Sequence, residues 1–230
     1  MKSISEFQTF MNAFDFSYIL SVVQGIIPAL ICITVHEFSH GLAAFFLGDK
    51  TAKNEGRLSL NPLKHLDLMG LVSMLVFHVG WAKPVPVNMY RFKNPKLGMA
   101  VTALAGPLSN ILLSLLVLLL FGFLYIPLCG FELGMYILSM IQLTAYISLG
   151  LAIFNLIPVP PLDGSKILLS CLNDESYEKL MRYERYGSLI LILLLVSGVL
   201  SEPLALIINK LFYLMSGISG IGINVVLKFM

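Results

Sequence analysis

The chain has 230 residues, of which 57% are hydrophobic and 12% are charged. A soluble globular domain carries about a quarter charged residues, so this composition excludes one and favours a membrane protein. Fifteen Lys and Arg against thirteen Asp and Glu leave a formal charge of +2, which is too small for a nucleic-acid-binding surface.

The first half of the chain contains one long apolar segment and one short one. The long segment covers residues 16–48 and exceeds the roughly 20 apolar residues that cross a bilayer. A polar stretch follows at 49–67, in which residues 57–60 alternate in the manner of a short strand. Residues 68–81 are apolar but shorter than a usual span, so they are predicted to cross or to re-enter on the same side.

The second half contains further apolar segments at residues 97–126, 135–157, 186–200 and 204–214. Together these patterns predict an all-α polytopic membrane protein with five or six transmembrane helices. A short β-hairpin or re-entrant element is expected between the first and third apolar segments.

The distribution of Lys and Arg predicts the orientation in the membrane. The loop before residue 97 contains Lys83, Arg91, Lys93 and Lys96 and no acidic residue, whereas the turn after residue 126 contains Glu132 and no basic one. Cytoplasmic loops of membrane proteins keep an excess of Lys and Arg. The first of these loops is therefore predicted to be cytosolic and the second external.

The first apolar segment contains the motif HEFSH, formed by His36, Glu37 and His40. Residues four apart lie on one face of a helix, so both imidazoles can bind one Zn²⁺ while Glu37 accepts a proton from water. Two His and one Glu inside an apolar helix are costly unless they are paired or bound to a metal. This burial favours a metal site over a chance match to the motif.

A catalytic zinc site needs a third protein ligand. Cys32 lies one turn before His36, but it is about 12 Å from His40 along the helix axis, which is too far for one ion. Asp163 is the better candidate, because it lies in NLIPVPPLDG, where Pro residues interrupt the helix and broken helix at membrane depth usually lines a cavity. Counted from the nearest polar boundary, His36 and Asp163 lie at similar depths of about 15–18 Å. A carboxylate at a loop edge near Lys166 is the alternative interpretation.

Gly106 and Asn110, in the sequence GPLSN of the third apolar segment, fall at about the same depth. A glycine lets two helices approach closely, and an amide can reach into a site. Asn110 alone is equally typical of a hydrogen bond between helices.

HEFSH, GPLSN and NLIPVPPLDG, in this order, resemble the three signature elements of the site-2 protease family of intramembrane zinc metalloproteases. The resemblance covers about residues 16–170. It implies that His36, His40 and Asp163 bind one Zn²⁺ per chain and that Glu37 is the general base. It further implies that Asn155 and Asn110, beside Gly106, hold the substrate or shape the site, and that the active site opens toward the cytosol.

We therefore expect one membrane-embedded metalloprotease domain over residues 1–230, with a catalytic core at about 16–170 and C-terminal helices at about 186–228. The length leaves no room for the PDZ or CBS domain that many members of the family carry, so the compact form is expected.

The expected function is hydrolysis of peptide bonds within or near transmembrane segments, in regulated intramembrane proteolysis or in the clearance of signal-peptide remnants. The expected partners are the lipid bilayer and single-span membrane proteins or signal peptides, with no nucleic acid and an open oligomeric state. Pro84 and Pro86 exclude a helix and leave an extended edge at residues 84–88. This edge, or the alternating stretch at residues 57–60, could pair with an unwound substrate.

Two other functions fit the same residues less well. Buried His and carboxylate side chains also mark ion pathways, so an intramembrane divalent-metal transporter is one alternative. A transporter commonly has repeated halves, and the sequence has one cluster and no repeat. The other alternative is an inactive membrane scaffold, which the intact set of His, Glu and Asp does not favour.

Overall fold

The computed structural model describes residues 16–67, 69–70, 82–173 and 186–229. Within these residues, four helical stretches are long and apolar enough to cross a membrane: Gln24–Phe46, Pro95–Leu128, Glu132–Asn155 and Ser201–Phe229. The predicted class, a mostly helical protein with several membrane-crossing helices, is confirmed at this level.

The described residues of the first half of the chain include one long helix and three short ones. They are α2 (Phe16–Phe46), α3 (Thr51–Asn54) and the 3₁₀ turns η1 (Pro62–Lys64) and η2 (Met89–Arg91). The next long helix, α5 (Pro95–Leu128), starts where the Asn94 side chain accepts a hydrogen bond from the Leu97 N–H at 3.2 Å. Pro95 follows this cap at a position where a missing N–H is harmless.

The second half begins with α6 (Glu132–Asn155), which ends at a proline-containing loop, and α7 (Asp163–Ser170) starts directly after that loop. A short apolar helix at Tyr186–Val196 comes next. The last two helices are α9 (Ser201–Ser216) and α10 (Ser219–Phe229).

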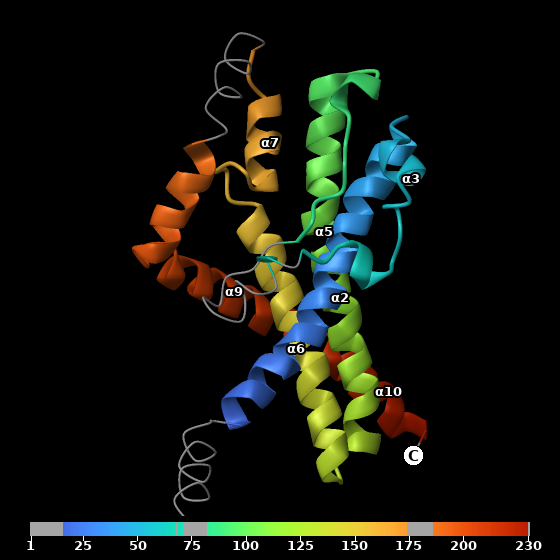
Figure 1. The fold of residues 1–230 in the computed structure, drawn as a ribbon. Coiled ribbons are helices and arrows are strands. Elements are labelled where there is room, and N and C mark those ends of the chain that lie inside the picture. Colours follow the sequence, from blue (N-terminus) through green and yellow to red (C-terminus); the bar gives the residue numbers. More distant parts are fainter. Residues whose placement is uncertain (1–15, 68, 71–81, 174–185, 230) are drawn as a thin grey trace, which may run out of the picture.

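Helix α5 lies at the centre of the molecule and contacts α2, α6, α7 and α10. In Figure 1, α2 crosses the bundle obliquely and α7 stands beside the N-terminal half of α5. Small residues make the close contacts of α5. A Cβ on Gly122 would overlap the Ser219 carbonyl of α10, and a Cβ on Gly98 would overlap the Phe92 ring. These two contacts hold α5 against α10 and Phe92, and α5 also packs against α2.

The prediction of five or six transmembrane helices is not supported by the described residues, in which four stretches qualify. Residues 186–200 are not among these four stretches, because the described helix Tyr186–Val196 is too short and ends before Gly198, which has a φ of +72°. Residues 204–214 fall within the fourth stretch, which α9 and α10 share. Most of residues 68–81 lie outside the described residues, so their crossing or re-entry stays a prediction.

The predicted β-hairpin is not supported either, because the described residues contain only one isolated antiparallel bridge, between Leu66 and Ala82. Residues 57–60 form no strand. The N–H groups of Arg57 and Leu58 both bond to the Ala52 carbonyl, at 2.8 and 3.2 Å, and close a turn after α3. Local turn bonds thus use the backbone groups that a strand would offer to a neighbour.

Candidate metal centre

His36 and His40 project from the same side of α2, as their spacing of four residues predicts. Their Nε2 atoms are 3.0 Å apart, and their rings are perpendicular with centroids separated by 4.5 Å. Both side chains are buried, with residue exposures of 5% and 9%. Two imidazole nitrogens therefore converge on one point inside the protein.

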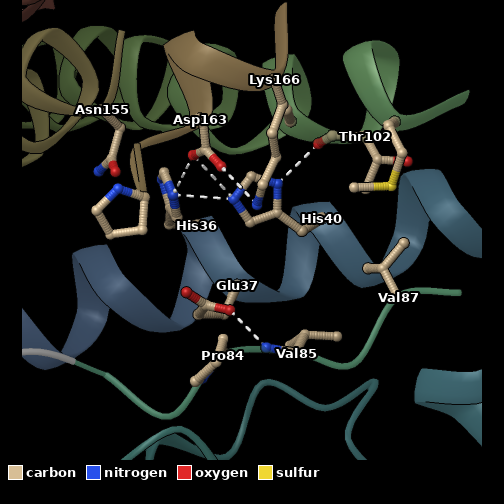
Figure 2. Close-up of a pocket in the computed structure, with 13 residues that line it drawn as sticks. His36, Glu37, His40, Pro84, Val85, Val87, Thr102, Asn155, Asp163 and Lys166 are labelled. Atoms are coloured by element: carbon tan, nitrogen blue, oxygen red, sulfur yellow. Dashed lines mark hydrogen bonds and ion pairs between the residues drawn. The ribbon is translucent and has the colours of Figure 1, made fainter. Parts of the chain in front are cut away.

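Asp163 joins this pair from the start of α7. Its Oδ2 atom lies 3.1 Å from His36 Nε2 and 3.2 Å from His40 Nε2, although 127 residues separate Asp163 from His36 in the chain. The loop between α6 and α7, which contains Pro158, Pro160 and Pro161, makes this approach. Figure 2 shows the three side chains pointing toward one another.

The three residues form a donor set that suits a metal ion. One ligand atom from each of His36, His40 and Asp163 lies within 4.8 Å of the others. Two imidazoles and one carboxylate are typical zinc ligands, and catalytic zinc sites use three protein ligands and leave a position open. The chemistry of these donors therefore fits zinc. Cys32 is not part of this group, and its Sγ donates to the Thr144 carbonyl at 3.5 Å.

Helix α5 supports the two imidazoles from behind. The Thr102 carbonyl lies 2.7 Å from His40 Nδ1, and the Asn110 amide lies 3.3 Å from His36 Nδ1. Gly106 lies between these two residues on α5, and a Cβ there would be 2.5 Å from His40 Nε2 and 2.7 Å from His36 Cε1. Gly106 and Asn110 thus both lie against the imidazole pair.

Glu37 faces away from this cluster, toward the extended segment formed by residues 82–88 (Figure 2). Its Oε2 accepts a hydrogen bond from the Val85 N–H at 2.8 Å. The side chain also lines a cavity of about 290 Å³, whose wall includes His36, His40 and Asp163. Glu37 therefore shares one cavity with the candidate ligands, while the Val85 N–H holds its carboxylate in place.

Asp49 attaches the same extended segment to the end of α2. Its Oδ2 accepts the Asn88 N–H at 2.6 Å, and its Oδ1 accepts the Thr51 N–H at 3.0 Å and the Thr51 hydroxyl. Burial raises the pKa of the Asp49 carboxyl, but these hydrogen bonds outweigh burial and hold the pKa below its usual range. Glu37 and Asp49 thus fix the segment to α2 at two points.

Asn155, at the C-terminal end of α6, lines the cavity but does not contact the ligand group within the described structure. Its Nδ2 donates to the Leu151 carbonyl of its own helix at 2.9 Å. The predicted site residues are thus brought into one region, with Asn155 at its edge.

Sequence reasoning did not single out three groups that line or support the site. Lys166 lines the cavity with its Nζ 4.0 Å from Asp163 Oδ1, and its place one turn after Asp163 on a helix is the signal that could have found it. The Thr102 carbonyl and the Val85 N–H are backbone groups. No residue type in the sequence signals a backbone contact of this kind.

The known proteins to which this chain is similar in sequence are peptidases by name. The sequence model described as Peptidase family M50 matches residues 131–198, which include α6, Asp163 and α7. A Bacillus subtilis protein named "Putative zinc metalloprotease YwhC" is 36% identical over 176 residues, which cover 75% of this chain and 80% of the relative.

A similar match is found in Mycolicibacterium smegmatis, to a protein named "Putative zinc metalloprotease Rip2". It is 30% identical over 191 residues, which cover 81% of this chain and 71% of the relative. No solved structure matches the chain.

Proposed function

Since the chain belongs to peptidase family M50, the site-2 proteases, and is an intramembrane zinc metalloprotease, we propose that His36, His40 and Asp163 hold its zinc and Glu37 is the general base. The convergence of three ligand atoms within 4.8 Å of one another, beside the cavity that Glu37 lines, carries this assignment. The names of the relatives do not favour the alternative of a metal transporter.

In peptide-bond hydrolysis, the zinc ion, Glu37 and the Val85 N–H have different roles. Zinc in such a site lowers the pKa of water toward neutrality and polarises the scissile carbonyl. Glu37 accepts a proton from the attacking water while the water oxygen bonds to the carbonyl carbon of the substrate. Glu37 then delivers a proton to the amine nitrogen when the C–N bond breaks. The Val85 N–H, which is 2.8 Å from Glu37 Oε2, keeps the carboxylate oriented during both transfers.

The substrates we propose are single-span membrane proteins or signal-peptide remnants. Backbone groups of a transmembrane helix are bonded internally, so the helix must unwind before its carbonyl can be attacked. The cavity wall includes Pro84, Val85 and Val87 of the extended segment, which supports this segment as the binding surface for the unwound strand.

One edge of the extended segment is suited to β-strand pairing. Pro84 and Pro86 have no N–H, so only the edge that carries the backbone groups of residues 85 and 87 can both donate and accept. In the described part of the chain, the Val85 carbonyl and both backbone groups of Val87 have no protein partner. We expect the substrate strand to pair there, so that Val87→Pro raises KM; an unchanged KM would contradict the pairing.

We propose in addition that residues 1–230 form one membrane domain, with a catalytic core at about 16–170 and C-terminal helices at about 186–228. The Lys and Arg residues between α2 and α5 support an active site that opens toward the cytosol.

The test is cleavage of a single-span membrane protein by the purified protein in detergent, with bound zinc quantified in parallel. Glu37→Gln is expected to abolish cleavage and keep about one zinc per chain, because Glu37 is not a ligand. His36→Ala is expected to lose both. Glu132→Gln, the same change at a glutamate in the first turn of α6, is the control and is expected to retain cleavage and zinc. Cleavage by Glu37→Gln at the wild-type rate would refute the assignment.

A further inference from the structure

Asn110 of α5 is fully buried, and its side-chain amide lies against the His36 imidazole. Asn110 Nδ2 is 3.3 Å from His36 Nδ1. Asn110 Oδ1, by contrast, has no hydrogen-bond partner among the described residues, although it is shielded from solvent. Buried polar atoms nearly always have partners, so an unpaired oxygen beside a candidate metal ligand requires an explanation.

The position of the proton on the His36 imidazole accounts for this unpaired oxygen. His36 Nε2 faces the other ligand atoms, 3.0 Å from His40 Nε2 and 3.1 Å from Asp163 Oδ2. An imidazole that binds a metal through Nε2 keeps its proton on Nδ1, and this N–H needs an acceptor. The NH₂ group of an amide only donates, so it cannot fill that role.

With the NH₂ group facing His36 Nδ1–H, two donors would meet. Rotation of the Asn110 amide by half a turn removes this mismatch, because it exchanges the amide oxygen and nitrogen without moving another residue. One amide atom lacks a protein partner among the described residues in either orientation. The contact with His36 therefore decides between the two amide orientations. It requires the amide oxygen to face His36 Nδ1, because only the oxygen can accept the Nδ1–H.

We propose that Asn110 is a positioning residue whose side-chain oxygen accepts the His36 Nδ1–H and thereby directs Nε2 toward the zinc. This inference rests on the proposed function, because it takes His36 to be a zinc ligand. His40 has an equivalent partner, since the Thr102 carbonyl lies 2.7 Å from its Nδ1. Thr102, Gly106 and Asn110 are spaced by four residues, so one face of α5 orients both imidazoles.

Asn110 is itself held firmly. Its backbone carbonyl accepts a hydrogen bond from the Ser148 hydroxyl of α6 at 2.8 Å. One turn further along α5, the Ser114 hydroxyl donates to the Ala145 carbonyl of α6, also at 2.8 Å. These bonds tie α5 to α6, so the Asn110 amide meets His36 from a fixed position.

The test compares Asn110→Leu with Asn110→Asp in the whole chain, purified in detergent, by measuring the Kd for zinc in competition with a chelator. Leu removes the acceptor at similar size, whereas Asp keeps an oxygen for the Nδ1–H, as in the carboxylate–histidine pairs of zinc sites. We expect Leu to weaken zinc binding by about 10–100-fold, the range for loss of such a partner, and Asp to stay within about threefold of the wild type.

Ser114→Ala is the matched control, because it removes a buried bond between α5 and α6 that touches neither imidazole. We expect Ser114→Ala to bind zinc with the affinity of the wild type. If Asn110 only held α5 against α6, Ser114→Ala would weaken zinc binding as much as Asn110→Leu does. Wild-type zinc affinity in Asn110→Leu overturns the inference. If Asn110→Leu does not fold, as judged by circular dichroism, a folded Asn110→Asp that binds zinc weakly overturns it equally.

His36→Ala separates this inference from the proposed function. Wild-type zinc affinity in His36→Ala would remove the proposed function itself. Loss of zinc in His36→Ala together with normal zinc binding in Asn110→Leu would overturn only the role of Asn110.

Discussion

A Cβ atom placed on Gly106 would lie 2.5 Å from Nε2 of His40. Real Cβ atoms essentially never approach another heavy atom this closely. The imidazole cannot easily retreat, because its Nδ1 is bound to the Thr102 carbonyl at 2.7 Å. Glycine at this position therefore lets α5 support the imidazole pair at van der Waals distance.

Gly106→Ala is accordingly expected to displace the two imidazoles and impair the site. We expect zinc affinity to fall by about tenfold or more, in the range seen when ligand orientation is disturbed, and cleavage to fall with it. Zinc titration and the cleavage assay check this. Gly25→Ala on α2 is the control, since a Cβ there meets nothing within 4 Å. Unimpaired zinc binding in Gly106→Ala would show that the imidazoles can retreat without loss.

The hydrogen bond between Val85 and Glu37 gives a second prediction. Val85→Pro removes the N–H that Glu37 Oε2 accepts, in a segment that is already extended and proline-rich. A well-placed general base contributes about 10²–10⁴-fold, so misplacing it is expected to lower kcat by about tenfold or more. Zinc content should not change, because the Val85 N–H bonds to Glu37 and not to His36, His40 or Asp163.

Val87→Pro provides the comparison for Val85→Pro, since it makes the same chemical change two residues along. It leaves the Glu37 bond intact and is expected to change KM rather than kcat. Steady-state kinetics on one membrane substrate separate the two effects. A Val85→Pro variant with wild-type kcat would mean that Glu37 does not need this bond.

Asp49 gives a prediction about pH. Its pKa is lowered in the folded protein, because hydrogen bonds from Asn88 and Thr51 outweigh the effect of burial. A carboxyl with a lowered pKa stabilises the fold above its unfolded pKa, about 4, and loses this contribution as the pH falls through the folded value. Hydrogen bonds to a charged group contribute about 1.5–3 kcal/mol each.

Asp49→Asn should therefore lower the thermal unfolding temperature at pH 7, and the difference from the wild type should shrink below about pH 4. Thermal unfolding in detergent at both pH values measures this. Glu55→Gln, at an exposed residue beside α3, should match the wild type at both pH values. A difference between Asp49→Asn and the wild type that is the same at pH 7 and pH 3 would argue against an ionised Asp49 as its cause.

Much of the site could be predicted from the sequence because helix geometry is regular. The spacing of His36 and His40 fixes their common face, and the rise per residue was enough to place Asp163, Gly106 and Asn110 at their level. The backbone contacts at Thr102 and Val85 could not be predicted, because every residue except proline has the same backbone N–H and C=O groups. Only the packing of α5 and of the extended segment selects these two.

The membrane topology was predicted less well, for a similar reason. Apolar composition at 186–200 favoured a span, but the described helix ends at Val196, and Gly198, with a positive φ, follows it. Alternation at 57–60 favoured a strand, but the Ala52 carbonyl accepts the two N–H groups that follow α3. In both places a local backbone conformation outweighs the average pattern of the side chains.

Two native cysteines provide a test of the proposed orientation. Cys129, at the end of α5, and Cys171, after α7, are both exposed, whereas Cys32 is buried. In Figure 1 the turn between α5 and α6 lies at the opposite end of the molecule from α3 and the C-terminal end of α7. We therefore expect Cys129 and Cys171 to report on opposite sides of the membrane.

We expect a membrane-impermeant maleimide, applied to intact cells, to label Cys129 and not Cys171. The reason is that Lys and Arg gather in the loop before α5, which predicts a cytosolic position for that end, whereas the turn beside Cys129 contains no basic residue. The Cys171→Ser variant isolates the signal of Cys129, and Cys129→Ser isolates that of Cys171. Labelling of Cys171 should appear only after the cells are permeabilised, which also shows that its thiol is reactive. Labelling of Cys171 in intact cells, with Cys129 protected until permeabilisation, would reverse the orientation and place the opening of the site outside the cell.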